Sequence, residues 1–250
     1  MSTFVLVHSP LVRGLTWSPV AEELRRRGME ALTPALQQDD DAREPFLKQH
    51  ARSVAHALRT LLADRPVILA GHSGAGPILP AIKLEAGRPV AAYLFVDAGL
   101  PENGEPRLGS GDLAQHLREL NARGDRFPNW TDEHLRAVVP DPGLRRDLLA
   151  ELRPQPWAFW EGPIPVFAGW PDVPCAYLRF APNSAYDTAA AEARRHGWLY
   201  AELSGGHFHM LVDPTAVTEA LLHLVRGLTQ RRGPQIPRRL PRARCGRDAK

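Results

Sequence analysis

Short apolar runs alternate along the chain with longer segments in which apolar positions recur at helical spacing. The apolar runs are rich in valine, leucine and isoleucine, as in strands that are buried on both faces of a parallel sheet. The alternation predicts an α/β fold, in which helices cover a doubly wound parallel sheet of about six strands. Predicted strands cover residues 4–8, 29–36, 66–70, 90–96, 175–180 and 198–203, and predicted helices cover residues 17–27, 45–63, 80–84, 188–196 and 214–228.

The regular alternation stops after the fourth predicted strand, between residues 101 and 173. Four of the six tryptophans lie in this stretch, together with helix-like segments at 132–138 and 142–152. We therefore expect a helical lid over residues 101–173, inserted into a single domain that covers residues 1–230. A chain of 250 residues is long enough for one such domain and does not require two.

Composition changes this picture little, since hydrophobic residues make up 44% and charged residues 24% of the chain, close to the averages for globular proteins. No apolar run reaches the roughly 20 residues that cross a bilayer, so no membrane partner is expected. The N-terminal residues lack the basic and hydrophobic regions of a signal peptide, and we expect a cytoplasmic protein. The two cysteines, Cys175 and Cys245, suggest neither a disulfide framework nor a metal cluster.

The charge is distributed unevenly along the chain. The last 20 residues, 231–250, carry seven Arg, one Lys and one Asp, a net charge of +7. The other 230 residues must then carry −4 for the whole chain to reach +3. A mildly acidic domain argues against a basic face for nucleic acid. The Pro/Arg-rich composition of residues 231–250 predicts a disordered basic tail.

The third predicted strand runs directly into the glycine-rich hexapeptide GHSGAG at residues 71–76. A Gly-x-Ser-x-Gly sequence between a strand and a helix is typical of a sharp turn that raises the serine hydroxyl above the sheet. The helix that follows points its N-terminus toward negative charge that develops near this hydroxyl. An apolar strand before the hexapeptide and a helix-compatible segment after it make Ser73 the candidate nucleophile.

A serine hydroxyl is a weak nucleophile at neutral pH and needs a base within hydrogen-bonding reach. His207 is the best candidate among the ten histidines, because it follows Gly205 and Gly206 at the end of the last predicted strand. Only His207 and His209 lie on the loop that this strand order brings beside Ser73. His209 therefore remains the competing base.

These motifs resemble the α/β-hydrolase superfamily over residues 3–230. The resemblance rests on VLVH at residues 5–8, GHSGAG at 71–76, FVDA at 95–98 and GHFH at 206–209. The compact form of the chain looks like the esterase and hydroxynitrile-lyase branch. The resemblance implies an α/β-hydrolase fold, a Ser/acid/His order along the chain and a lid after the strand that ends near Asp97. It leaves the substrate open, since this fold carries many chemistries.

The acid of this site is open between two carboxylates. In the family that the chain resembles, the acid usually follows the strand that here covers 175–180, and Asn183 stands at that position. An amide orients a histidine but does not compensate the imidazolium charge. Asp97 ends the preceding strand, where some family members carry the acid, and is the preferred candidate. Asp187 is the alternative, although an aspartate there also suits the start of a helix, and a site without a functional acid is the third reading.

The loop expected to form the oxyanion hole departs from the family pattern. Family members usually read His-Gly-x, in which the N–H of x binds the oxyanion, whereas this chain reads His8-Ser9-Pro10-Leu11. Proline has no N–H, and loss of one such donor typically costs on the order of 3 kcal/mol of transition-state stabilisation. The Gly74 N–H is the first expected donor. The second is either the Ser9 hydroxyl, an arrangement that resembles hydroxynitrile lyases, or the Leu11 N–H.

Trp157 and Trp160 are the candidate substrate-binding residues, as part of an apolar pocket under the lid, although packing within the lid explains them equally well. The sequence shows no metal-ligand spacing and no phosphate-binding GxxxxGK loop, so neither a metal nor a cofactor is expected.

The leading hypothesis is a serine hydrolase, most simply a carboxylic ester hydrolase, that acts on a small ester, thioester or amide. One alternative is a lyase or another proton-transfer enzyme on the same fold, which Ser9 and Pro10 favour. The other is a non-catalytic ligand-binding protein, which Asn183 and Pro10 favour. The expected partner is a small-molecule substrate, and the sequence makes no prediction of oligomeric state.

Overall fold

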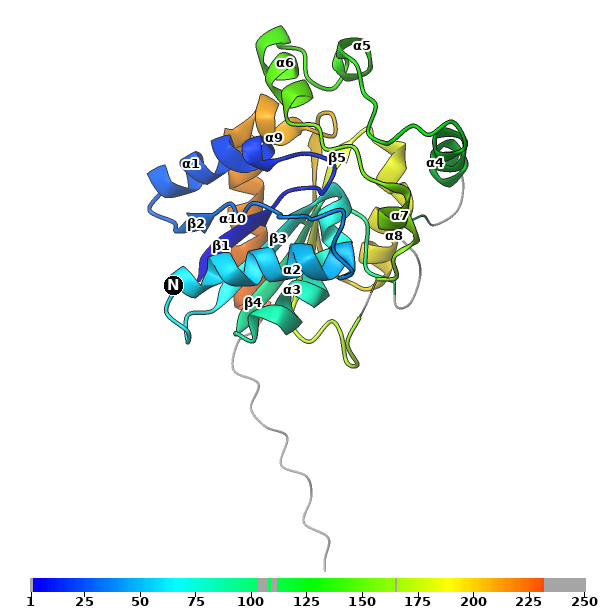
Figure 1. Ribbon diagram of the computed structural model, residues 1–250. Coiled ribbons are helices and arrows are strands. Elements are labelled where there is room, and N and C mark those ends of the chain that lie inside the picture. The colour runs from blue at the N-terminus through cyan, green and yellow to red at the C-terminus, as the bar shows by residue number, and fades with distance from the viewer. Residues whose placement is uncertain (1, 103–107, 109–111, 165, 232–250) are drawn as a thin grey trace, which may run out of the picture.

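The computed structural model describes residues 2–102, 108, 112–164 and 166–231 (Figure 1). Its parallel strands form one sheet in the order β2-β1-β3-β4-β5-β6, which confirms the predicted parallel sheet of about six strands. The strands are β1 (Thr3–Val7), β2 (Ala31–Leu32), β3 (Val67–His72), β4 (Val90–Val96), β5 (Cys175–Ala181) and β6 (Leu199–Ser204).

Helices cover both faces of the sheet and create two apolar cores. Along β1, Phe4 and Leu6 belong to one core, whereas Val5 and Val7 belong to the other, as the two-residue period of a strand requires. Because the strands are buried on both faces, their sequences read as continuous apolar runs. The first core is closed by α1 (Ser18–Arg26) and α10 (Pro214–Arg231), and the second by α2 (Phe46–Ala57), α3 (Leu79–Ala86) and α8 (Asp187–Arg195).

The predicted strand at 29–36 is much shorter in the structure. Only Ala31 and Leu32 pair with β1, at the edge of the sheet. Pro34 follows within two residues, and proline has no N–H to donate to a strand ladder. The apolar pattern therefore continues beyond the point where backbone pairing ends, and Leu36 is buried without belonging to a strand.

The helix predicted from residue 80 is preceded by a 3₁₀ helix, η3 (Ser73–Ile78). Pro77 has no N–H to donate to the Ser73 carbonyl four residues earlier. The Gly99 N–H donates to that carbonyl instead, at 3.3 Å. This bond holds the loop after β4 against the turn after β3. Outside the insertion between β4 and β5, the other short helices of the described residues are η1 (Gly14–Trp17), η2 (Leu58–Thr60), η4 (Ser184–Tyr186) and α9 (His209–Val212).

Helices are inserted between β4 and β5, where the sequence predicts a lid. Within the described residues they are α4 (Asp112–Ala122), α5 (Asp132–Leu135), α6 (Pro142–Ala150) and α7 (Trp157–Glu161), of which α5 and α6 stand above the sheet in Figure 1. Periodicity predicts α5 and α6 but misses α4 and α7. Residues 103–107, 109–111 and 165 of the predicted lid, and 232–250 of the predicted tail, lie outside the described residues.

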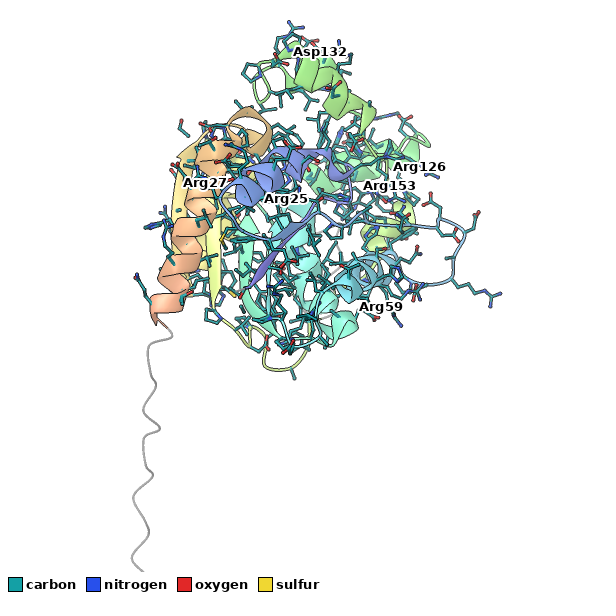
Figure 2. All side chains as sticks on the ribbon, turned by 90° about the vertical axis from the view of Figure 1, so that its left-hand side faces the viewer. Arg25, Arg27, Arg59, Arg126, Asp132 and Arg153 are labelled. Atoms are coloured by element: carbon teal, nitrogen blue, oxygen red, sulfur yellow. The ribbon has the colours of Figure 1, made fainter. Side chains whose placement is uncertain are left out.

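Two arginines tie the inserted region to the chain that follows β2 (Figure 2). Arg153 donates to the backbone carbonyls of Leu36, at 2.7 Å, and Gln38, at 3.2 Å. Arg126 forms an ion pair with Asp40 at 3.0 Å. The inserted region is therefore held in place by polar contacts as well as by its own packing. None of the described helices is both long and apolar enough to span a membrane.

Candidate active site

The turn that carries Ser73 has the backbone strain of a nucleophile elbow. Ser73 joins β3 to η3 with a φ of 58°, an unusual conformation for a residue other than glycine, and only 4% of its surface is exposed. A Cβ on Gly76 would lie 2.2 Å from the Gly99 carbonyl oxygen, and one on Gly71 would lie 3.0 Å from the Ala75 backbone. Side chains at these two positions would therefore prevent the close approach that forms the turn.

The structure brings His207 against Asp97. His207 follows β6 and Asp97 follows β4, two strands apart in the sheet. The His207 Nδ1 lies 2.6 Å from the Asp97 Oδ2, and the Asp97 side chain is fully buried. The Phe180 N–H donates to the other carboxylate oxygen, Oδ1, at 3.3 Å. A buried carboxylate needs such partners, and here they come from β5 and from the loop after β6.

Asn183 stands where the family pattern places the acid, and it binds Asp97. Its Nδ2 donates to the Asp97 Oδ2 at 2.5 Å, and its Oδ1 accepts the Ala185 N–H at 3.3 Å. The same Nδ2 lies 3.2 Å from the His207 Nδ1. Because the His207 Nδ1 carries the proton shared with Asp97, that third contact joins two donors and is not a hydrogen bond. Asn183 therefore orients the carboxylate and does not replace it.

The two competing residues lie elsewhere. Asp187 is the first residue of α8, and its exposed carboxylate accepts a hydrogen bond from the Arg179 guanidinium. His209 begins α9, and its ring packs against Phe180. Among the described residues, neither Asp187 nor His209 forms a hydrogen bond with His207 or Asp97.

His72, next to the candidate nucleophile, contacts His207 through a hydrogen bond and through its ring. Its Nε2–H donates to the His207 carbonyl oxygen at 2.9 Å, and the centroids of the two rings lie 4.5 Å apart. Burial and then the neighbouring His207 lower the pKa of His72 well below its usual value. His72 therefore stays neutral and does not oppose a positive charge on His207.

Tyr186, the last residue of η4, is a site residue that the sequence analysis missed. Its hydroxyl lies 2.9 Å from the Ser73 Oγ. Its ring stacks on that of His207, with a centroid distance of 5.2 Å and an angle of 18°. Burial raises the pKa of Tyr186 to about 12. Among the described residues no hydrogen bond joins the Ser73 Oγ to His207. In this conformation the Ser73 hydroxyl is hydrogen-bonded to the Tyr186 hydroxyl instead.

The loop after β1 lies against the turn at Ser73 and Gly74, here called the elbow. A Cβ on Gly74 would lie 3.4 Å from the Ser9 Oγ and 3.5 Å from the Pro10 Cδ. The side chains of Ser9 and Pro10 thus lie beside Gly74, and Pro10 has no N–H to donate there. The Leu11 N–H donates to the Ser9 Oγ at 3.3 Å, so the two alternatives for the second oxyanion donor are bonded to each other. Gln155 fixes the loop by donating to the Pro10 carbonyl at 2.6 Å.

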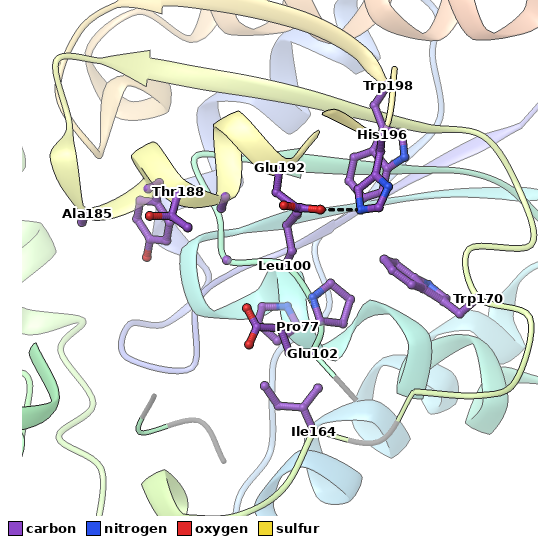
Figure 3. A pocket seen from close by; sticks show the side chains of 14 residues that line it. Pro77, Leu100, Glu102, Ile164, Trp170, Ala185, Thr188, Glu192, His196 and Trp198 are labelled. Atoms are coloured by element: carbon purple, nitrogen blue, oxygen red, sulfur yellow. Dashed lines mark ion pairs between the residues drawn. The ribbon is translucent and has the colours of Figure 1, made fainter. Parts of the chain in front are cut away.

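Trp157 and Trp160 lie on α7, in an apolar cluster of the inserted region. Trp160 is 7% exposed and packs edge-on against Phe127, and Leu11 from the loop over the elbow touches the same cluster. A cavity of about 590 Å³ lies elsewhere, beside Tyr186 (Figure 3). Neither Trp157 nor Trp160 lines it, whereas Trp170 and Trp198 do, with an ion pair between Glu192 and His196 at 3.0 Å.

In the part of the chain that the structure describes, no group of three or more His, Cys, Asp or Glu side chains is arranged to hold a metal ion.

Comparison with known proteins agrees with this architecture. The model of the alpha/beta hydrolase family matches residues 4–220. No curated protein matches the chain. An extracellular α/β-hydrolase from a Paenibacillus species is 19% identical with a TM-score of 0.74, covering 90% of this chain and 99% of its own. A methylesterase from Arabidopsis is 18% identical with a TM-score of 0.67, covering 91% and 100%. A pyrethroid hydrolase from Sphingobium faniae is 18% identical with a TM-score of 0.68, covering 92% and 99%.

Proposed function

The chain belongs to the alpha/beta hydrolase family, and on this premise we propose that it is a serine hydrolase that cleaves a small ester, thioester or amide. The observation that carries the proposal is the contact of 2.6 Å between His207 and the buried Asp97, beside the strained turn of Ser73. The methylesterase and the pyrethroid hydrolase among the structural neighbours make an ester the first substrate class to test.

In the proposed reaction Ser73 attacks the carbonyl carbon of the substrate while His207 accepts the Oγ proton at Nε2. The Oγ–carbon bond forms and the carbonyl electron pair moves onto its oxygen, which the Gly74 N–H binds at the start of η3. Asp97 accepts a hydrogen bond from the His207 Nδ1–H. This bond keeps the proton on Nδ1, and the carboxylate balances the charge of the imidazolium. His207 then protonates the leaving group as its bond to the carbonyl carbon breaks and the carbonyl re-forms, which leaves an acyl group on Ser73. Water then attacks this acyl carbon and gives a proton to His207, and His207 returns the proton to the Ser73 Oγ as the Oγ–carbon bond breaks.

Attack on the substrate requires the Ser73 hydroxyl to turn from Tyr186 toward His207. The change is a rotation about the Cα–Cβ bond of one small side chain, which is rapid on the time scale of catalysis. Catalytic hydrogen bonds are often absent before substrate binds. The hydrogen bond between Ser73 and Tyr186 is therefore compatible with hydrolysis.

A fluorophosphonate probe tests this proposal, because it phosphonylates only an activated serine. We expect wild-type protein to be labelled at Ser73 and Ser73→Ala to be unlabelled. Ser53→Ala is the matched control, since the Ser53 hydroxyl bonds within α2 and to the Gln37 N–H, away from the site. A folded wild-type protein that resists the probe, and that hydrolyses p-nitrophenyl acetate no faster than Ser73→Ala, contradicts the proposal.

A lyase or another proton-transfer enzyme is the second candidate, and the loop over the elbow favours it. The Ser9 hydroxyl lies beside Gly74 where a hydrolase usually supplies an N–H, and the Pro10 ring removes that donor. Such an enzyme would use Ser73 and His207 as a proton relay without an acyl-enzyme. It predicts no burst of product with p-nitrophenyl esters and turnover of a cyanohydrin, the reverse of the outcome expected for a hydrolase.

A further inference from the structure

We propose that Tyr186 is a further catalytic residue, whose hydroxyl donates a hydrogen bond to the Ser73 Oγ while that oxygen carries negative charge. The inference rests on the proposed serine hydrolase. It starts from the distance of 2.9 Å between the Tyr186 hydroxyl and the Ser73 Oγ, the atom that forms and breaks the covalent bond. No family motif of the sequence includes Tyr186.

The hydroxyl of Tyr186 is suited to donate and not to act as a base. Burial raises the pKa of Tyr186 to about 12, so the phenol keeps its proton throughout the neutral range. In the free enzyme Ser73 and Tyr186 share one hydrogen bond, in which either hydroxyl can donate. Once Ser73 gives up its proton to His207, Tyr186 is the only one of these two hydroxyls that still has a proton, so it becomes the donor to the Oγ.

The surroundings hold Tyr186 in place for this role. Its ring stacks on His207. Its N–H donates to the Asn183 carbonyl at 3.4 Å, and Asn183 also caps the start of η4 through the Ala185 N–H. Asn183 thus connects the segment of Tyr186 with the Asp97 carboxylate. One residue, Asn183, therefore contacts both the acid and the segment that carries the tyrosine.

The loop after β1 explains why an additional hydrogen-bond donor at the Ser73 Oγ would favour the reaction. Pro10 lies beside Gly74 and has no N–H to donate, and the Leu11 N–H is directed to Ser9. The Oγ is partly negative when its proton moves to His207 during attack, and again when the Oγ–carbon bond breaks in deacylation. In both steps Tyr186 donates a hydrogen bond and keeps its own proton. The transferred proton therefore passes only between Ser73, His207 and the leaving group or water. A charge-assisted donor at this atom offsets part of the missing stabilisation.

The position of the tyrosine also relates the nucleophile to the 590 Å³ cavity of Figure 3. Tyr186 lines this cavity and its hydroxyl contacts Ser73, so this one side chain connects the cavity with the nucleophile.

Tyr186→Phe separates the hydroxyl from the ring, because phenylalanine keeps the stacking on His207. Tyr200→Phe is the matched control, since the Tyr200 hydroxyl donates to Glu202 at the surface. We expect Tyr186→Phe to lower the rate of fluorophosphonate labelling of Ser73 about 10- to 100-fold. With p-nitrophenyl acetate we expect kcat and kcat/KM to fall by similar factors while KM stays within about twofold, because the bond strengthens only in the transition states. Tyr200→Phe should match the wild type in each measurement.

Three results overturn the inference and leave the serine hydrolase proposal in place. Equal labelling of the wild type and Tyr186→Phe shows that the hydroxyl does not act on the Oγ. Faster labelling of Tyr186→Phe shows that the hydroxyl holds Ser73 away from His207, a lock and not a catalytic donor. A higher KM with unchanged kcat assigns Tyr186 to substrate binding. If the wild type itself is unlabelled, the serine hydrolase proposal fails and this inference fails with it, which is distinct from the other outcomes. A melting temperature of Tyr186→Phe close to that of the wild type ties the loss to the hydroxyl.

Discussion

Replacing Asp97 by Asn removes the charge of the proposed acid with little change in shape. Asn adopts positive φ more readily than most residues, so it suits the φ of 42° at this position. In the variant the His207 Nδ1–H loses its anionic acceptor, and the imidazolium formed in catalysis loses its buried counter-charge. We therefore expect the protein to stay folded and to lose most of its activity.

The size of the loss can be worked from the geometry. Two unit charges about 4 Å apart, a reasonable separation of charge centres for the contact at Asp97, attract by about 4 kcal/mol at an effective dielectric constant of 20. Each 1.36 kcal/mol in the barrier changes the rate tenfold, so the charge alone is worth about a thousandfold in kcat. Loss of the correct His207 tautomer adds to this, and the same substitution in a serine protease costs about ten-thousandfold. We expect a loss between these two values.

Hydrolysis of p-nitrophenyl acetate at pH 7.5, in parallel with fluorophosphonate labelling, measures the effect. Asp187→Asn is the control, because Asp187 is exposed and pairs with Arg179. Its activity should stay within about twofold of the wild type, in keeping with the small energies of exposed ion pairs. Asp97→Asn that keeps more than a tenth of the activity, or Asp187→Asn that loses most of it, refutes the assignment of the acid.

Two further predictions concern the oxyanion loop and the buried histidines. Pro10→Ala adds an N–H where the proline ring faces Gly74, so kcat/KM for p-nitrophenyl acetate should rise about tenfold; no increase in a variant of unchanged melting temperature contradicts that position for the missing donor. Burial lowers the pKa of both His72 and His8 in the folded protein. Their protonation therefore favours the unfolded chain, so stability is full above the unfolded value of about 6.5 and falls as the pH drops below it. The melting temperature should decline from pH 7 to pH 5, less steeply in His72→Gln than in the wild type, and parallel declines would argue against titration of His72.

Much of the fold follows from the sequence because it depends on local patterns. Strands buried on both faces read as apolar runs, and β4 has the residue bounds that its run of Val90–Val96 indicates. The departures are local too. Pro34 lies just beyond the shortened β2 and Pro77 within the 3₁₀ start of the helix after Ser73, because each lacks an N–H that regular structure needs. The helices α4 and α7, which the sequence analysis misses, belong to a third apolar cluster that includes Leu11 and Phe46, and not to the two cores beside the sheet.

In the candidate site, too, some features follow from local sequence and others only from the tertiary structure. The sequence by itself determines the turn of Ser73 and the loop of His207, since glycines at fixed spacing after a strand specify such turns. Which carboxylate meets His207 depends on how two loops of neighbouring strands fold over the edge of the sheet, and only the tertiary structure decides it for Asp97. The hydroxyl of Tyr186 beside the Oγ is decided in the same way. Both contacts join residues about a hundred positions apart, and no local propensity acts over that separation.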